Sequence, residues 1–405
     1  MYRREALATG AARRFFVAHA QSCLGSGLAH VALPLLAFDK TGSPWAVTAV
    51  LVPDLLPAIV LGPLLGALVD RVGWRGCAIA ADLMRALAFG VIAVWGSMGS
   101  IVAAAALAGT GTALFAPAAL SGLGRLAPGD GRPAALGLFG ALDDIGLTAG
   151  PALAALLLAG LPASALLGAN AASFAISAFL IAGIRFAGGP VVEDVERPAS
   201  IWTDVRRGLR DLSGRPDVRL LLLSSMAAVL CAGVTNVGEV VLAREVLDVG
   251  GSGLALLVAA AGVGTVLGSL AARSALAWQW RRAYITGLAC MAADLVLSAL
   301  APDLWLLLPI FAIGGFGNGF ALVHDRLLLG DAVPVALHGR VFALQKGLTS
   351  LAFAASFAGA SGLIAGIGVQ RTFLLAGAGM LAVVLVAAPR LRAVWPAPAG
   401  TPATA

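Results

Sequence analysis

The sequence predicts an all-α membrane protein that crosses the bilayer many times. Its 405 residues are 60% hydrophobic and 12% charged, with a mean hydropathy of +0.93, whereas about a quarter of the residues in a soluble domain are charged. Apolar runs of roughly 18 or more residues, long enough to cross a ~30 Å hydrocarbon core as a helix, recur along the chain. Twelve such segments are predicted, at 14–38, 45–69, 77–95, 100–126, 138–160, 163–184, 218–242, 253–275, 283–300, 304–329, 341–366 and 370–388.

A long polar interruption divides these segments into two sets of six. The predicted organisation is an N-terminal bundle at 1–184, a cytoplasmic linker at 185–217, a C-terminal bundle at 218–389 and a cytoplasmic tail at 390–405. In the linker, apolar side chains share one helical face and arginines take the others. This pattern suits a short helix on the inner leaflet, and a plain solvated linker is the alternative.

The distribution of basic residues indicates the orientation, because Lys and Arg are retained on the cytoplasmic side. They gather at the N-terminus and at the even-numbered connections, where Arg71, Arg75 and Arg85 are counted. The exceptions are Lys40, Arg244 and Arg371. Both termini are therefore expected in the cytoplasm. The net charge of +6 is interpreted as a topology signal and not as a nucleic-acid-binding surface.

The two halves contain an internal repeat. The stretch "GALVDRVGWRG" follows the second predicted helix of the first half and "GSLAARSALAWQWRR" follows that of the second, which aligns Gly66 with Gly268. A second echo aligns Arg132 with Arg340. Repeated membrane halves indicate a transporter whose substrate site lies between two bundles and opens alternately to each side.

Two motifs resemble those of the major facilitator superfamily. The first resembles its signature for the loop between the second and third helices, and consists of Gly66, Asp70, Arg71, Gly73 and Arg75. The second resembles its antiporter motif in the fifth helix, and consists of Gly137, Gly146, Gly150 and Pro151. The stretch "ADLMRA", Asp82 to Arg85, looks like the siderophore-exporter and macrolide-efflux branch of the family.

The resemblance implies two bundles of six helices and a secondary active transporter in a bacterial cell (inner) membrane. We expect an exporter of small amphipathic or hydrophobic compounds, driven by protons, acting as a monomer without cofactor or metal. A lipid or other small-molecule transporter, importer or uniporter is the alternative, and a membrane-embedded enzyme is a remote one. The chain has no G-x-x-x-x-G-K-[ST] motif, which argues against ATP as the driving force.

The charged loop has a physical interpretation. Asp70 is expected at the C-terminus of a helix, where the helix dipole disfavours a negative charge. Arg71 or Arg75, and the N-terminus of the neighbouring helix predicted at 341–366, could compensate it. A contact with the other bundle would exist in one conformation only, so we interpret Asp70 as a conformational latch; a loop that only fixes topology is the alternative.

The glycines and the proline of the fifth helix predict a bent helix with a flat face. We expect a helix from the other half to approach this face closely. The motif would then seal and hinge the transporter.

Carboxylates inside the predicted helices are candidates for proton coupling, because an ionised group in the bilayer requires a cavity or a partner. At ~1.5 Å per residue, Asp54 lies about 14 Å inside its helix, and Asp143 and Asp144 lie about 8 Å inside theirs. Glu239 is placed near the outer end of its helix. The first helix has no acidic residue at mid-depth and offers His19 in its place.

Other polar residues in the helices are secondary candidates, namely Asp82, Arg85, Asn236, Asp294, Asn318 and Arg340. Asp294 lies about 17 Å inside a helix that is usually peripheral in this fold, so a structural role is favoured for it. The adjacent residues His324, Asp325 and Arg326 are interpreted mainly as interfacial charge.

Overall fold

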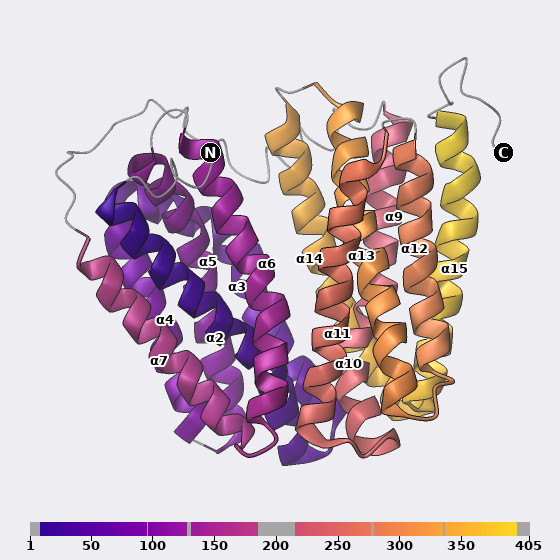
Figure 1. Cartoon of the computed structure of the whole chain (residues 1–405), viewed down its shortest axis with the longest axis horizontal. Helices are drawn as coiled ribbons and strands as arrows, with labels where there is room; N and C mark the ends of the chain where they lie inside the picture. The colour runs from indigo at the N-terminus through magenta and orange to yellow at the C-terminus, as the bar shows by residue number, and fades with distance from the viewer. Residues whose placement is uncertain are drawn as a thin grey trace. The chain divides into compact units, whose positions relative to one another are not determined.

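The computed structural model of this chain describes residues 9–94, 96–127, 131–184, 215–276, 279–334 and 337–394, and within these ranges every regular element is a helix (Figure 1). The side chains of Pro63, Gly339, Arg340 and Ala343 are not part of the description. The amphipathic segment predicted in the linker lies outside the described residues.

The first six membrane helices are α2 (Gly10–Thr41), α3 (Pro44–Val72), α4 (Trp74–Val94), α5 (Met98–Leu126), α6 (Gly131–Leu157) and α7 (Ala163–Ala182). The later elements are α9 (Pro216–Ala232), α10 (Val234–Val241), the π-helical turn η1 (Leu242–Val246), α11 (Gly250–Ala271), the 3-10 turn η2 (Ala272–Ser274), α12 (Trp280–Ser298), α13 (Leu304–Ala332), α14 (His338–Ile367) and α15 (Val369–Val394). Each of the twelve predicted segments overlaps a helix, and α9, α10 and η1 follow one another over the segment predicted at 218–242 and extend beyond both of its ends. The predicted all-α membrane fold is confirmed.

Local sequence signals set the helix ends. The Thr9 hydroxyl accepts a hydrogen bond from the Ala12 amide at 3.1 Å and caps the start of α2. Gly42 follows α2 with φ +62°, and Gly73 separates α3 from α4 with φ +95°. Glycine adopts such positive φ angles without the steric cost that a side chain would add, so both tight connections depend on it.

Eleven spans in the described residues are long and apolar enough to cross a membrane, and α9, α10 and η1 together form one of them. Helix α12 differs because Arg281, Arg282 and Asp294 fall within its 19 residues. Its position in the repeat nevertheless matches that of α4. The chain is therefore a multi-pass membrane protein.

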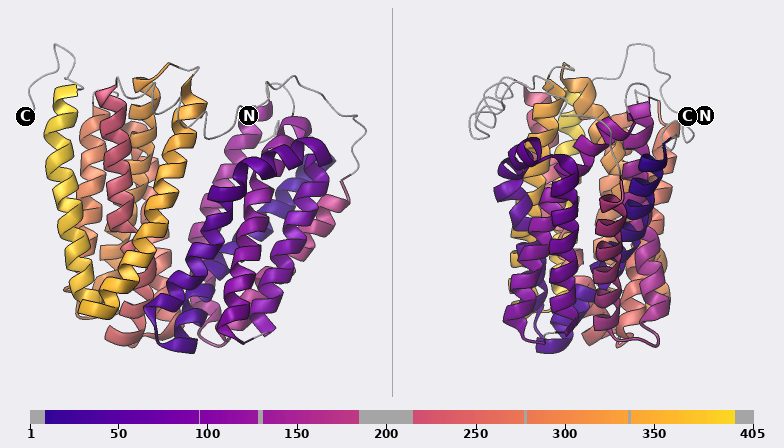
Figure 2. Two further views of the ribbon diagram at one scale, coloured as in Figure 1. Left: turned by 180° about the vertical axis from the view of Figure 1, so that it is seen from behind. Right: turned by 90° about the vertical axis from the view of Figure 1, so that its left-hand side faces the viewer.

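The helices form two compact units. The first comprises residues 1–196 and 248–259, and the second comprises 197–247 and 260–405. In both units the helices run side by side (Figures 1 and 2). In the first unit, α2 contacts α6 and α7, and α4 contacts α5 and α7. In the second, α9 contacts α14 and α15, and α12 contacts α13 and α15. The same order of helices pairs in the same way, so the repeat seen in the sequence is also a repeat of packing.

Within each unit, a glycine brings two helices into backbone contact, and the helix pairs of the two units are equivalent. A side-chain carbon on Gly109 of α5 would collide with the backbone of Asp54 in α3. A side-chain carbon on Gly315 of α13 would collide with the backbone of Ala261 in α11. Small residues allow such close approach in membranes, where van der Waals packing takes over from the hydrophobic effect. In each unit a glycine of the fourth membrane helix therefore lies against the backbone of the second.

The interior of the first unit is filled with aromatic rings between α2, α5 and α6. The His19 ring lies parallel to the Phe139 ring at 4.0 Å between centroids, and it also stacks with Phe115 at 6.0 Å. Phe15 packs against His19, Phe139 and Trp74. These rings pack against one another between α2, α4, α5 and α6. The second unit differs at the equivalent helices.

Candidate functional site

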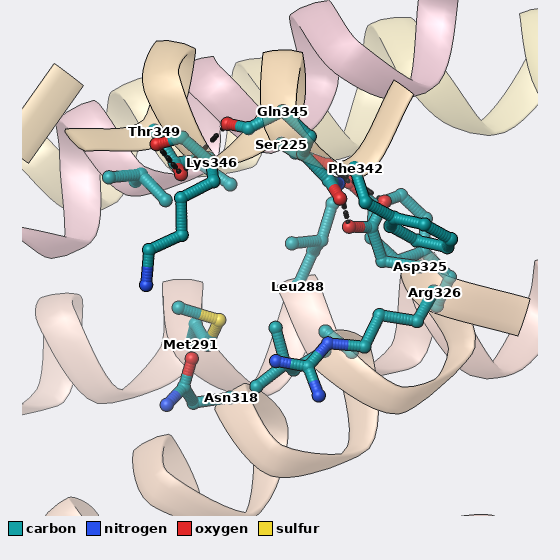
Figure 3. Close-up of a pocket in the computed structure, with 15 residues that line it drawn as sticks. Ser225, Leu288, Met291, Asn318, Asp325, Arg326, Phe342, Gln345, Lys346 and Thr349 are labelled. Atoms are coloured by element: carbon teal, nitrogen blue, oxygen red, sulfur yellow. Dashed lines mark hydrogen bonds between the residues drawn. The ribbon is translucent and has the colours of Figure 1, made fainter. Parts of the chain in front are cut away.

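A cavity of about 490 Å³ lies between α9, α12, α13 and α14 in the second unit (Figure 3). These helices correspond in order to α2, α4, α5 and α6 of the first unit, where aromatic rings fill the interior. Its polar lining residues are Ser225, Tyr284, Asn318, Asp325, Arg326, Gln345, Lys346 and Thr349. The size is within the range of about 300–1,000 Å³ that small-molecule sites occupy.

A hydrogen-bonded carboxylate, Asp325, forms the polar floor of the cavity. The Ser225 hydroxyl donates to Asp325 Oδ1 at 2.8 Å, and the Gln345 amide donates to Oδ2. The Tyr284 hydroxyl lies 3.0 Å from the Ser224 hydroxyl and 3.4 Å from that of Ser225. Asp325 is only 5% exposed. Three helices thus hold this carboxylate in a fixed position, as buried polar groups require.

The interpretation of His324 and Asp325 as interfacial charge is wrong, because both side chains are buried. His324 Nδ1 lies 2.6 Å from the Phe320 carbonyl oxygen, one turn earlier in α13. Arg326, in contrast, is exposed. A signal for this site is present in the sequence, because Ser224 and Ser225 interrupt the apolar part of α9. Only the structure shows that Ser225 bonds the carboxylate and that Tyr284 lies next to both serines.

A second polar cluster lies in the first unit, where α2 meets α6. His19 Nε2 and Asp143 Oδ1 are 3.2 Å apart, and the Cys23 thiol donates to the same oxygen at 3.3 Å. The side chain of His19 is 5% exposed and that of Asp143 is 49% exposed. Of the two neighbouring acids singled out in the sequence, the structure therefore brings Asp143, and not Asp144, to the histidine.

The cluster of His19, Cys23 and Asp143 has the residue types of a metal site, with candidate ligand atoms within 4.8 Å of one another. However, Cys23 Sγ lies 3.5 Å from His19 Nε2 and 3.7 Å from Nδ1. A sulfur almost equally distant from both ring nitrogens lies beside the ring, whereas a metal bound at Nε2 would hold the sulfur beyond that nitrogen. The geometry fits a hydrogen-bonded group better than a shared metal.

A buried arginine, Arg85, interacts with two acidic residues of the first unit, Asp82 and Asp54. Its guanidinium forms an ion pair with Asp82, one turn earlier in α4, and interacts electrostatically with Asp54. The guanidinium carbon lies 4.3 Å from the Phe115 ring centroid and 4.1 Å from that of Phe174. Arg85 is 7% exposed and Asp82 is 0% exposed. Counting Arg85 among the cytoplasmic loop charges was therefore wrong.

The loop motif is divided between exposed charges and a helix cap. Asp70 and Arg71 are exposed at the end of α3. The Arg75 guanidinium instead donates to the backbone carbonyls of Ile181, at 3.3 Å, and Ala182. These carbonyls end α7, where a cation is favoured by the helix dipole. Arg75 thus caps a helix in this structure, and compensation of Asp70 by Arg71 or Arg75 stays a prediction.

The glycines of α6 meet a helix of their own unit. A side-chain carbon on Gly146 would collide with the Cys23 backbone, and one on Gly150 would collide with Gly27, both in α2. We expected a helix of the other half at this face. The structure places α2 against it, and Pro151 is buried beside Gly150. Gly137 has open space around the position of a side-chain carbon.

The latch glycine Gly66 also has open space where a side-chain carbon would lie.

Glu239 and Asn236 lie in α10, and the carboxylates of Glu239 and of Asp294 in α12 repel each other. Asp294 accepts a hydrogen bond from Ser298 at 3.1 Å and packs against Gly314.

Of the remaining secondary candidates, Asn318 lines the cavity. Arg340 lies in α14, and its side chain is outside the described part of the chain.

Known proteins place this architecture in a family. A model of the Major Facilitator Superfamily matches residues 15–354. The chain is 28% identical to the multidrug efflux pump Tap of Mycolicibacterium fortuitum, over 91% of this chain and 93% of that protein. It is also 28% identical to the MFS-type transporter YfiS of Bacillus subtilis, over 90% and 89%.

Solved structures show the same fold at low sequence identity. The nucleoside transporter NupG superimposes with a TM-score of 0.77 and 13% identity, over 95% of this chain and 100% of that chain. A bacterial homologue of the human lysosomal transporter Spinster gives 0.69 and 14%, over 94% and 95%. The chain therefore belongs to the major facilitator superfamily of membrane transporters.

Proposed function

We propose that the protein is a secondary active exporter of small amphipathic compounds. The observation that carries this proposal is the cavity of about 490 Å³ in the second unit, with its apolar walls and hydrogen-bonded carboxylate floor. Such a cavity suits a small molecule with an apolar body and few polar groups. The similarity to a multidrug efflux pump over nearly the whole chain supports export as the direction.

We further propose that proton entry drives export and that the first unit carries the proton. Asp143 is half-exposed, and one of its oxygens lies against both His19 and Cys23, so an accessible carboxylate has polar partners. Asp54 is exposed and interacts with the buried cation Arg85. A carboxylate within a membrane helix and next to a second titratable or charged group is the usual arrangement of a proton relay. Glu239 of α10 is a further candidate, in the second unit.

Flux into everted membrane vesicles tests the function. We expect several amphipathic compounds of a panel to accumulate in vesicles that contain the protein when their lumen is acidified. A protonophore should abolish this accumulation, because secondary transport depends on the ion gradient. Accumulation only in right-side-out vesicles would indicate an importer. Uptake insensitive to the protonophore would contradict proton coupling.

The coupling residues are tested by separating uphill from downhill transport. We expect that Asp54→Asn or Asp143→Asn abolishes accumulation against a gradient and still permits downhill equilibration, because the alternating movement remains intact. Asp144→Asn is the matched control, since it removes the neighbouring carboxylate that lies away from His19. If both test variants accumulate substrate as the wild type does, the proton is carried elsewhere or not at all.

A further inference from the structure

We propose that the cavity of the second unit selects amphipathic anions, compounds in which a carboxylate, sulfonate or phosphate group is attached to an apolar body, through Arg326 and Lys346. This inference deepens the proposed function by naming the class of compound that the site takes. It concerns equilibrium binding to one unit of the protein, and it does not depend on the direction of transport or on its driving force.

Two cations extend into the cavity from different helices. Arg326 comes from α13 and Lys346 from α14, and both side chains are exposed. Figure 3 shows the charged ends of both side chains extending into the space between the helices. Within the described part of the chain, neither cation takes part in an ion pair. An anion bound between them would contact the planar guanidinium of Arg326 and the ammonium group of Lys346. Proteins use these two groups to bind carboxylates and phosphates.

The carboxylate of the floor does not cancel both cations. Asp325 interacts electrostatically with Arg326, but its two oxygens already accept hydrogen bonds from Ser225 and Gln345. Two cations and one carboxylate line the cavity, which leaves an excess of one positive charge. A cationic compound would be repelled by this excess, whereas an anionic compound would be attracted by it.

The rest of the lining accepts an apolar body. Leu288 and Met291 of α12, Val229 of α9, and Leu322 and Phe342 form the apolar walls. Methionine and aromatic side chains adapt to apolar molecules of varied shape. The equivalent helices of the first unit instead carry the stacked rings of His19, Phe115 and Phe139.

The lysine content of the chain gives a direct measurement of binding. Lys346 and Lys40 are its two lysines, and Lys40 lies at the end of α2 in the first unit. An amine-acylating reagent therefore labels one lysine in the cavity and one outside it. Peptide mass spectrometry reports both within the same sample of full-length protein in lipid nanodiscs. Bound anion should protect Lys346 and leave Lys40 unchanged.

A pair of probes isolates the contribution of the anionic group. The dye 8-anilinonaphthalene-1-sulfonate and N-phenyl-1-naphthylamine share one apolar skeleton, and only the first carries a sulfonate. We expect the sulfonate to protect Lys346 at a concentration about tenfold lower than the neutral compound does, the effect of one hydrogen bond to a charged group. Arg326→Gln should remove most of this difference. Arg371→Gln is the matched control, because Arg371 is an exposed arginine outside the cavity.

Other results would overturn the inference. Equal protection by both compounds would mean that the cavity selects only the apolar body. Protection by neither would mean that it binds no compound of this class. The measurement needs no gradient, so it separates the site from the function. Protection of Lys346 without flux in vesicles would support the site and contradict export. Flux without protection of Lys346 would support export and contradict the site.

Discussion

At the scale of single residues, Arg85 shows how a charge is kept inside a membrane bundle. Its guanidinium is paired with Asp82 and lies between the rings of Phe115 and Phe174. The pair replaces water as the partner of the charge, and the rings add cation–π attraction of about 0.5–2 kcal/mol. Removal of one member leaves the other buried without a partner, and this loss is larger than the net value of the pair.

We therefore expect Asp82→Asn to destabilise the protein by about 3 kcal/mol. The measurement is the thermal unfolding midpoint in detergent, which should fall clearly. Asp70→Asn is the control, since Asp70 is exposed and its loss should leave the midpoint unchanged. The double variant Asp82→Leu/Arg85→Met should recover much of the stability, because it removes both charges. An unchanged midpoint in Asp82→Asn would show that the ion pair is not structural.

At the scale of helices, glycines decide which pairs approach closely. Gly27 of α2 and Gly150 of α6 face each other, and a side-chain carbon on either would collide with backbone atoms of the other helix. Backbone cannot rotate away from such a collision, whereas a flexible side chain can. The contact between α2 and α6 also positions Asp143 against His19. The polar cluster therefore depends on the close approach that the glycines allow.

We expect Gly27→Ala and Gly150→Ala to cost about 1–3 kcal/mol each, as overpacked sites do, and to lower the amount of folded protein. Gly137→Ala and Gly140→Ala are matched controls on α6, because their side-chain carbons would meet open space. Size-exclusion profiles and membrane abundance measure the difference. If Gly137→Ala folds normally but fails to transport, that glycine has a role beyond packing within the first unit.

At the scale of the whole molecule, the topology sets what each charged group faces. Reporter fusions after Gly189 and after Ala397 should report the cytoplasm, and one after Gly251 should report the outside. The reason is that basic residues are retained on the cytoplasmic side. This argument still holds when the buried Arg85 is left out of the loop charges. An external signal at Gly189 would contradict the arrangement of six helices before the linker.

The proposed latch at Asp70 also belongs to the whole molecule, because its effect would differ between conformations. Asp70 is exposed at the end of α3. We expect Asp70→Asn to insert and accumulate normally and to lower the transport rate about tenfold, if one charged hydrogen bond is lost in one state. Vesicle flux normalised to protein amount measures this. Wild-type flux would leave the loop with a topological role only, and Arg71→Gln tests whether charge in general is responsible.

The sequence by itself determined the helices, their number and their grouping into repeats. Length and hydropathy are sufficient for this, because the bilayer requires every backbone group of a spanning segment to be bonded within it. The motif containing Asp70 and Gly73 was also readable, since it depends on residues adjacent in the chain. The glycines of α6 were recognised as a motif, but not their partner helix.

Only the tertiary structure decided which polar side chains meet. The sequence indicates interfacial charge at Asp325, whereas the buried carboxylate is bonded by Ser225 and Gln345, which lie on two other helices. Arg85 was counted with loop arginines because a sequence shows charge but not the ion pair and rings that bury it. Asp143 and Asp144 are chemically identical neighbours, and the rotation of α6 against α2 alone distinguishes them. Pairing between helices depends on their relative rotation and depth, and neither quantity is encoded in the periodicity of one segment.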